Sequence, residues 1–232
     1  MHVLSLLFSL LAAAVAVSAI PKPANIPPTR PSLDVPRCPK VATARFSKSV
    51  PEQTPFPQTA VDLCWEPNTL QLTFKAFEER SFYFDPKQRI NDDIWMYEVM
   101  EAFIHHGRDD PQTYLEFEVN PNNVTYQAFV YNPSKVRKQG APFDHFFITD
   151  PIVDGIIAST DLDRKAQLWV SKAQIPLALF NVENPRDTWW RMNFFRTVTS
   201  RETLPNQQLG AWSSPDKANF HITPFFGDVH LV

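Results

Sequence analysis

The sequence predicts an all-β protein, an antiparallel β-sandwich of two sheets with a jelly-roll or immunoglobulin-like architecture. Short runs of alternating apolar and polar residues recur along the chain, and stretches with helical periodicity are few. The 22 prolines fall largely between these runs, in segments typical of turns. At 232 residues the chain can form one large domain with a full core. We therefore expect one sandwich domain over residues 41–232.

Two segments precede this domain. Residues 1–19 contain no Asp, Glu, Lys or Arg, hold a largely apolar stretch, and end in the small-x-small pattern Val17-Ser18-Ala19, which is typical of signal-peptide cleavage. Residues 20–40 are rich in proline, which predicts an extended, poorly packed arm. No later run is apolar enough to span a membrane. We expect a secreted, extracellular protein.

A predicted disulfide and a predicted glycosylation site are both consistent with an extracellular protein. Cys38 and Cys64 are an even pair of cysteines in a secreted chain, which predicts one disulfide between them. A metal or redox role would require closer spacing or more ligands. The triplet Asn123-Val124-Thr125 follows a proline in a predicted turn and is a glycosylation sequon. Asn123 is thus a predicted glycan site, with an unused triplet as the alternative.

Charge excludes some classes of partner. The net charge is -3, and no cluster of Lys and Arg could follow a nucleic-acid backbone or an anionic bilayer. The chain has five glycines, and no phosphate-binding glycine-rich motif occurs. We expect a monomer without a nucleic-acid or membrane partner.

The alternating runs give the expected strands. Residues 61–65 and 70–76 flank a short polar turn and predict a hairpin. Further strands are expected at residues 41–46, 114–119, 125–131, 156–159, 166–171, 189–197 and 229–232. Residues 176–180 predict a single helical turn, and residues 132–150 a long polar loop. A loop of that length is a candidate for function.

Residues 91–104 are the stretch around which we expect the protein to be organised. From Glu98 onward the residues alternate as in a strand, with one apolar face and one that carries Glu101. A carboxylate is costly to bury there unless it is hydrogen-bonded. Trp95 follows the acidic turn at residues 91–93, and an indole beside a carboxylate suits a sugar. Because an extended strand would separate Trp95 and Glu101 by roughly 20 Å, a shared site requires residues 91–97 to fold back.

Catalytic signatures are missing from the sequence. It has no Gly-x-Ser-x-Gly elbow and no His-Glu-x-x-His motif. The pairs Glu98 with Glu101 and Glu116 with Glu118 could be the acid and nucleophile of a glycosidase. Strand alternation directs Glu116 and Glu118 outward, however, where acidic residues are ordinarily solvated. These observations favour a binding protein over an enzyme.

The tryptophans divide into two groups. Trp65, Trp169 and Trp190 fall on alternating strands and are predicted core residues. Trp95 and Trp212 fall beside turns, where a large indole exposes apolar surface unless it binds something.

Five blocks follow in order along residues 43–232: Trp95-x5-Glu101, residues 114–121, residues 190–196, residues 211–215 and residues 220–227. Together they resemble the family 9 carbohydrate-binding modules, in particular secreted fungal and bacterial relatives within the wider DOMON-like group. The resemblance implies a β-sandwich that holds a sugar between two tryptophans, in characterised modules the reducing end of a glucan or xylan chain. Bound calcium would be structural, and no other cofactor is required.

The resemblance also assigns positions. Trp95 matches the first tryptophan, Glu101 the carboxylate on the following strand, and Trp212 the second tryptophan. Leu209 replaces the asparagine expected ahead of that second tryptophan. The remaining predicted sugar contacts are Asn193 and Arg196, as substitutes for that asparagine, and Glu116, where family members carry a basic residue.

The leading hypothesis is a non-catalytic module that recognises a plant or microbial polysaccharide, alone or beside a separate enzyme. One alternative is a haem-binding electron-transfer domain, since DOMON-like relatives use a Met and a His as axial ligands. Met96, Met100 and His105 are available, but Met100 should face the core. The other alternative is a glycoside hydrolase.

Overall fold

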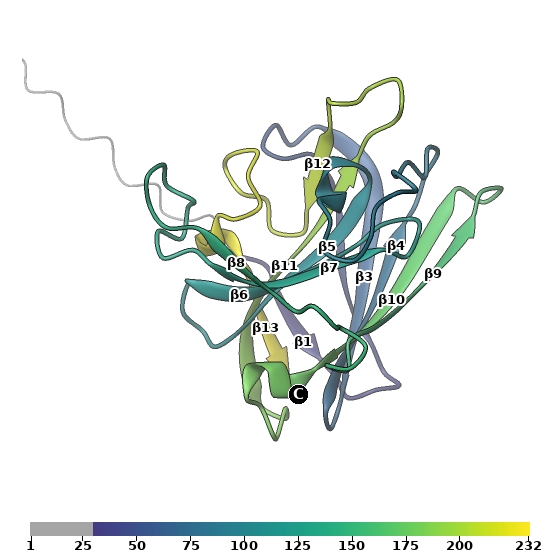
Figure 1. The fold of residues 1–232 in the computed structure, drawn as a ribbon. Helices are drawn as coiled ribbons and strands as arrows, with labels where there is room; N and C mark the ends of the chain where they lie inside the picture. Colours follow the sequence, from purple (N-terminus) through teal and green to yellow (C-terminus); the bar gives the residue numbers. More distant parts are fainter. Residues whose placement is uncertain (1–29) are drawn as a thin grey trace, which may run out of the picture.

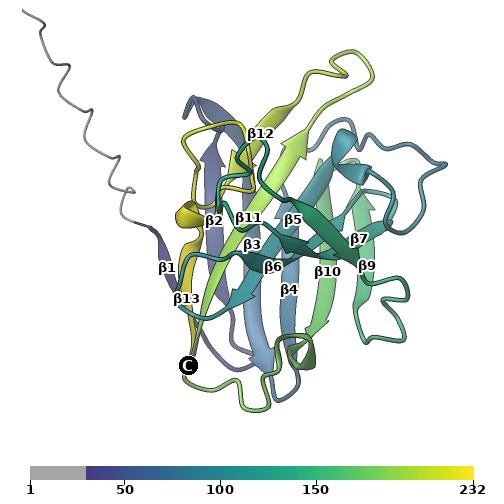
Figure 2. The same ribbon diagram turned by 60° about the vertical axis from the view of Figure 1, so that its left-hand side comes forward.

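The computed structural model describes residues 30–232, so the predicted signal peptide and the first part of the predicted arm lie outside the described residues. Two β-sheets pack face to face in the described part of the chain (Figure 1), and the view in Figure 2 shows the same two layers from another side. This arrangement confirms the predicted β-sandwich.

The larger sheet has eight strands within residues 30–232. Across the sheet they are β1 (Ser32–Val35), β13 (Gly227–Leu231), β11 (Thr188–Val198), β5 (Val99–His106), β6 (Thr113–Val119), β7 (Thr125–Tyr131) and β8 (Asp144–Phe147), with β12 (Gln208–Ala211) paired to β11. β1 runs parallel to β13, and the other strand pairs of this sheet are antiparallel.

The smaller sheet is antiparallel and has five strands in the described region. In order they are β2 (Ala42–Lys48), β3 (Pro55–Glu66), β4 (Thr69–Ala76), β10 (Leu168–Pro176) and β9 (Ile157–Asp163). Short 3-10 helices are η1 (Ile94–Met96), η2 (Leu177–Phe180) and η3 (Thr223–Phe225). Among residues 30–232, no helix combines the length and the apolar character needed to cross a bilayer.

The core lies between the sheets and follows the predicted alternation. The inward residues of β5 and β6 are fully buried in it: Met100, Ala102, Ile104, Leu115, Phe117 and Val119. Trp65, Trp169 and Trp190 also belong to this core, as predicted. Burial of large apolar side chains is the main source of stability here.

Some elements differ from the sequence prediction. Residues 32–35 form β1, where a poorly packed arm is expected, because Val35 is fully buried and the backbone pairs with β13. β8 and β12 lie where no strand is predicted, and each has only four residues, too few for a clear alternation. β9 extends to Asp163, beyond the end of the strand expected at residues 156–159, because residues 161–163 continue to pair with β10.

The predicted disulfide joins Cys38 to Cys64 across a sequence separation of 26 residues. The amide of Cys38 also donates a hydrogen bond to the carbonyl of Trp65. The chain ahead of β2 is thereby attached to β3.

An ionic cluster is buried at one end of the core. The Arg196 guanidinium donates to Glu79 Oε2 at 2.9 Å, and both side chains are almost completely inaccessible. Glu98 lies nearby, and its Oε2 accepts a hydrogen bond from the Tyr83 amide at 2.6 Å. Burial, followed by the negative charge of Glu79, raises the pKa of Glu98 to about 8.

Removing the cross-link should lower stability. We expect the double substitution Cys38→Ala with Cys64→Ala to reduce the free energy of unfolding by about 3 kcal/mol, because the unfolded chain regains loop entropy. Urea denaturation followed by tryptophan fluorescence measures the change. A double variant as stable as the parent would contradict this role.

Glu98 should make stability depend on pH. Its folded pKa lies above the unfolded value of about 4.3, so its stabilising contribution is complete below that value and is lost as pH rises towards 8. Between pH 5 and 9 the parent should lose on the order of a few kcal/mol more than Glu98→Gln. Urea midpoints at both pH values test this. Identical pH dependence in both proteins would refute it.

Candidate functional site

Three glutamates lie side by side on the outer face of the larger sheet. Glu101 of β5 is directly opposite Glu118 of β6, and Glu116 lies two residues along the same face of β6. Their exposed fractions are 3%, 1% and 4%, respectively. The expectation that Glu116 and Glu118 are solvated is therefore wrong.

The outer face is closed because chain segments far apart in the sequence cover it. Phe103, Tyr114, Phe195 and Phe226 form a second buried cluster on this face, outside the core between the sheets. The ring of Phe220 stacks on Phe195 with 4.1 Å between ring centroids. Strand alternation specifies which residues point outward, but it does not reveal that loops pack over them.

A cavity of about 540 Å³ remains between this face and its covering segments, with the glutamates in its wall. Aromatic residues in the wall are Trp95, Tyr126, Phe143, Phe147 and Phe220. Polar residues there include Arg137, Gln207, Asn219, His145 and His221. The predicted functional loop, residues 132–150, supplies four of these side chains: Arg137, Phe143, His145 and Phe147.

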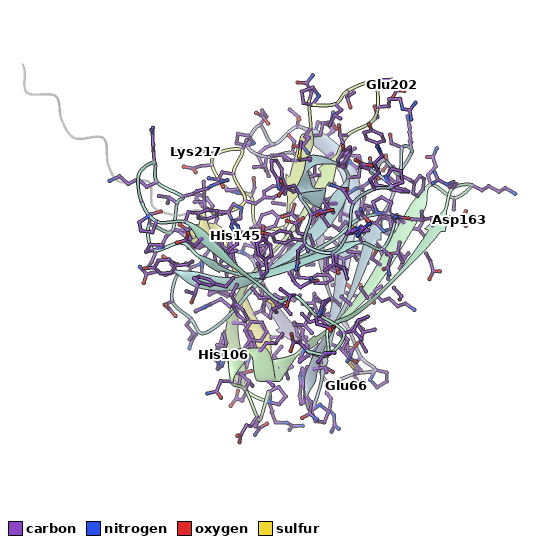
Figure 3. All side chains as sticks on the ribbon, viewed as in Figure 1. Glu66, His106, His145, Asp163, Glu202 and Lys217 are labelled. Atoms are coloured by element: carbon purple, nitrogen blue, oxygen red, sulfur yellow. A yellow bond between two sulfur atoms is a disulfide. The ribbon has the colours of Figure 1, made fainter. Side chains whose placement is uncertain are left out.

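The glutamates and histidines form one polar group. One carboxylate oxygen from each of Glu101, Glu116 and Glu118 lies within 4.8 Å of the others. His145, labelled on β8 in Figure 3, places Nε2 3.5 Å from Glu116 Oε2. His221 places Nε2 3.9 Å from Glu116 Oε1, and its Nδ1 lies 2.6 Å from the Tyr114 hydroxyl.

Burial shifts the ionisation of these groups. It raises the pKa of Glu101 well above its usual range, and the Glu116 carboxylate reinforces the shift. Burial likewise raises the pKa of Glu118, with added repulsion from Glu101 and Glu116. It lowers the pKa of His221 to about 4. The raised pKa values favour the protonated carboxyl form of Glu101 and Glu118, which donates as well as accepts hydrogen bonds, and the lowered pKa of His221 favours its neutral imidazole.

The structure brings Trp95, Glu101 and Glu116 together. Residues 91–97 fold back through η1, as a shared site requires, so Trp95 and Glu101 line the same cavity. The carbonyl of Trp95 accepts a hydrogen bond from Gln207 at 2.8 Å. The indole is 49% exposed.

The structure places Trp212, Asn193 and Arg196 outside the cavity wall. Trp212 packs against Phe194 with 5.6 Å between centroids and lies over Gly227, where any larger residue would collide with the indole. It is not part of the cavity wall, so the two tryptophans do not form the expected pair around the cavity.

The other two residues have structural partners. Asn193 donates to the Ser213 carbonyl and accepts from the Ser213 amide. Arg196 points to the inner face, as the strand alternation of β11 requires, and is held by Glu79. Neither is in the cavity wall.

Several cavity residues escaped prediction. Glu118, His145 and His221 belong to the polar group, but the sequence separates them by up to about a hundred positions. One signal was available, since alternation places Glu101, Glu116 and Glu118 on equivalent faces of consecutive strands. That pattern could have marked a shared acidic site.

The residues of the haem alternative lie apart. Met100 is buried in the core between the sheets, as expected, and Met96 is 45% exposed before β5 begins. His105, near the end of β5, contacts the Thr113 carbonyl and Asp109. A Met–His pair that includes His105 does not converge here on an axial-ligand geometry. Asn123, the predicted glycan site, is exposed in the turn between β6 and β7.

Two solved structures with a similar fold are described as carbohydrate-binding. A putative carbohydrate-binding protein from Bacteroides uniformis aligns with a TM-score of 0.63 and 14% identity, covering 88% of this chain and 99% of that one. A family 9 carbohydrate-binding module from Caldicellulosiruptor kristjanssonii, in complex with cellotriose, aligns with a TM-score of 0.60 and 13% identity over 87% and 93% of the chains. At these identities the likeness establishes the fold.

Sequence comparison gives a nearer relative. No family model matches the chain. An extracellular protein from Arthroderma benhamiae is 63% identical over 202 residues, which cover 87% of this chain and 91% of that protein. The chain belongs to the same family as this extracellular protein.

Proposed function

We propose that this protein is an extracellular carbohydrate-binding protein and that its saccharide ligand occupies the cavity over Glu101, Glu116 and Glu118. The observation that carries the proposal is the composition of the cavity wall, in which buried carboxyl groups and exposed aromatic rings face the same space.

The chemistry of the wall matches that of a sugar. Pyranose rings present hydroxyl groups at their edges and C–H groups on their faces. Carboxyl and amide groups can bond the hydroxyls, and aromatic rings can cover the C–H faces. The volume of about 540 Å³ lies within the range of small-molecule pockets.

Trp95 is the principal candidate for stacking. Its indole is half exposed at the cavity, while its backbone is fixed by η1 and by the hydrogen bond from Gln207. A fixed, exposed indole loses little conformational freedom on binding. Stacking on such a ring is worth roughly 1–3 kcal/mol by analogy with base stacking.

The comparisons support the same proposal. The solved neighbours include family 9 module structures from Caldicellulosiruptor kristjanssonii in complex with cellotriose and in complex with glucose. The Arthroderma benhamiae relative is described as extracellular. Glucan-type and xylan-type oligosaccharides are therefore the first ligands to test.

Calorimetry with cello- and xylo-oligosaccharides tests the site. Trp95→Ala should weaken binding by roughly 5- to 150-fold, the equivalent of the stacking energy. Phe146→Ala is the matched control, because Phe146 is 62% exposed on β8 but is not in the cavity wall. Loss of binding to the reduced alditols would identify recognition of a reducing end. Equal affinity of Trp95→Ala and the parent would rule the site out.

A second candidate function is hydrolysis of a glycosidic bond. It is favoured by the three carboxyl groups within 4.8 Å, a spacing near the roughly 5 Å of retaining glycosidases, and by the raised pKa of Glu101, which favours its protonated form. In this case the protein releases reducing sugar from oligosaccharides, and Glu101→Gln abolishes the release. Release that persists in Glu101→Gln, or no release by the parent, eliminates hydrolysis by this acid.

A further inference from the structure

We propose that Glu101, Glu116 and Glu118 form a binding site for one divalent cation of the Mn²⁺ type, with His145 as a flanking imidazole ligand. The same three carboxyl groups line the cavity of the saccharide proposal, but the cation site does not depend on that proposal, since a cation can bind the cluster whether or not a sugar enters the cavity.

The cluster has little internal compensation for its charge. Glu101 and Glu118 are directly opposite on neighbouring strands, a position where like charges destabilise a sheet. Within residues 30–232, no Lys or Arg forms an ion pair with any of the three acids. Arg137 lines the cavity, but its guanidinium lies over the Phe143 ring at 4.5 Å. A dication would offset this concentration of acidic groups.

Unsatisfied oxygens provide a second, independent observation. Glu116 Oε2 and Glu118 Oε2 are buried without a hydrogen-bond partner in the described part of the chain. Both side chains are more than nine-tenths buried. Buried polar atoms are normally satisfied, so two such oxygens facing one cavity point to a ligand.

The contrast with other buried acids is informative. Glu79 accepts hydrogen bonds from the amides of Ser81 and Phe82 and pairs with Arg196, so its carboxylate is satisfied by the protein itself. Within residues 30–232, no backbone amide or guanidinium donates a hydrogen bond to the cavity glutamates, and the imidazole of His145 lies 3.5 Å from Glu116 Oε2. They resemble a ligand set that is completed from outside.

The geometry and donor types fit a small divalent cation. Three carboxylate oxygens within 4.8 Å of one another are close enough to bind one cation through metal–oxygen bonds of about 2.0–2.6 Å. Carboxylate oxygens suit Mn²⁺, and His145 adds an imidazole nitrogen 3.5 Å from Glu116 Oε2. The Tyr114 hydroxyl lies 2.6 Å from His221 Nδ1 and fixes the His221 ring, whose Nε2 lies 3.9 Å from Glu116 Oε1. His221 is thus placed to orient the Glu116 carboxylate from outside the ligand set. Open coordination positions would face the cavity, available to water or to a ligand oxygen.

Mn²⁺ binding to the full secreted protein tests the proposal directly. Protein dialysed against chelator is titrated with Mn²⁺ in the absence of sugar, and free Mn²⁺ is followed by electron paramagnetic resonance. We expect one equivalent to bind, and Glu116→Gln and Glu118→Gln to weaken binding at least about tenfold. Glu98→Gln, a buried glutamate outside the cavity, is the matched control and should bind as the parent does.

A crystal soaked in Mn²⁺ gives a readout that needs no variant. An anomalous-scattering peak between the three carboxylates supports the site, and its absence there overturns it. The proposal is also overturned if the parent binds no Mn²⁺. It is overturned as well if Glu116→Gln and Glu118→Gln bind Mn²⁺ as tightly as the parent while circular dichroism shows that all three proteins are folded. Because sugar binding is measured separately, failure of the cation site and failure of the saccharide proposal can be distinguished.

Discussion

Burial of three acidic side chains on one face of a sheet is the constraint on which the rest of this structure depends. A carboxylate loses its hydration when it is buried, and a close second carboxylate adds repulsion. Glu101, Glu116 and Glu118 meet both conditions, since they are almost inaccessible and within 4.8 Å of one another. A chain selected for stability alone would place apolar residues there. Their presence supports the proposal that this face is the functional one.

The two faces of the larger sheet therefore differ in what they pack against. The inner face packs a continuous apolar core against the smaller sheet, and this core holds β5 and β6 in a fixed register. The outer face carries the acids, covered by segments that bring aromatic and imidazole groups over them. A rigid sheet under a cover of loops is a common way to hold polar groups at set distances. Here it positions carboxyl groups, imidazoles and an exposed indole around one cavity.

Much of the fold could be predicted because local patterns determine it. Alternation along residues 99–104 and 114–119 correctly assigned the core residues of both strands, and two cysteines in a chain predicted to be secreted correctly predicted one disulfide. The candidate site was predictable only in part. Trp95 and Glu101 share a cavity because residues 91–97 fold back, a condition that the strand geometry already imposed. Trp212 instead fills space over Gly227, and His145 and His221 reach the glutamates through loops. Such long-range packing leaves no periodic signal in the sequence.

The most direct test of this account is a crystal structure of the protein with a bound cello- or xylo-oligosaccharide. The account predicts a sugar ring in the cavity, with one face on Trp95 and its hydroxyls bonded to the buried glutamates. A saccharide bound at another surface, with this cavity filled only by water, would contradict it.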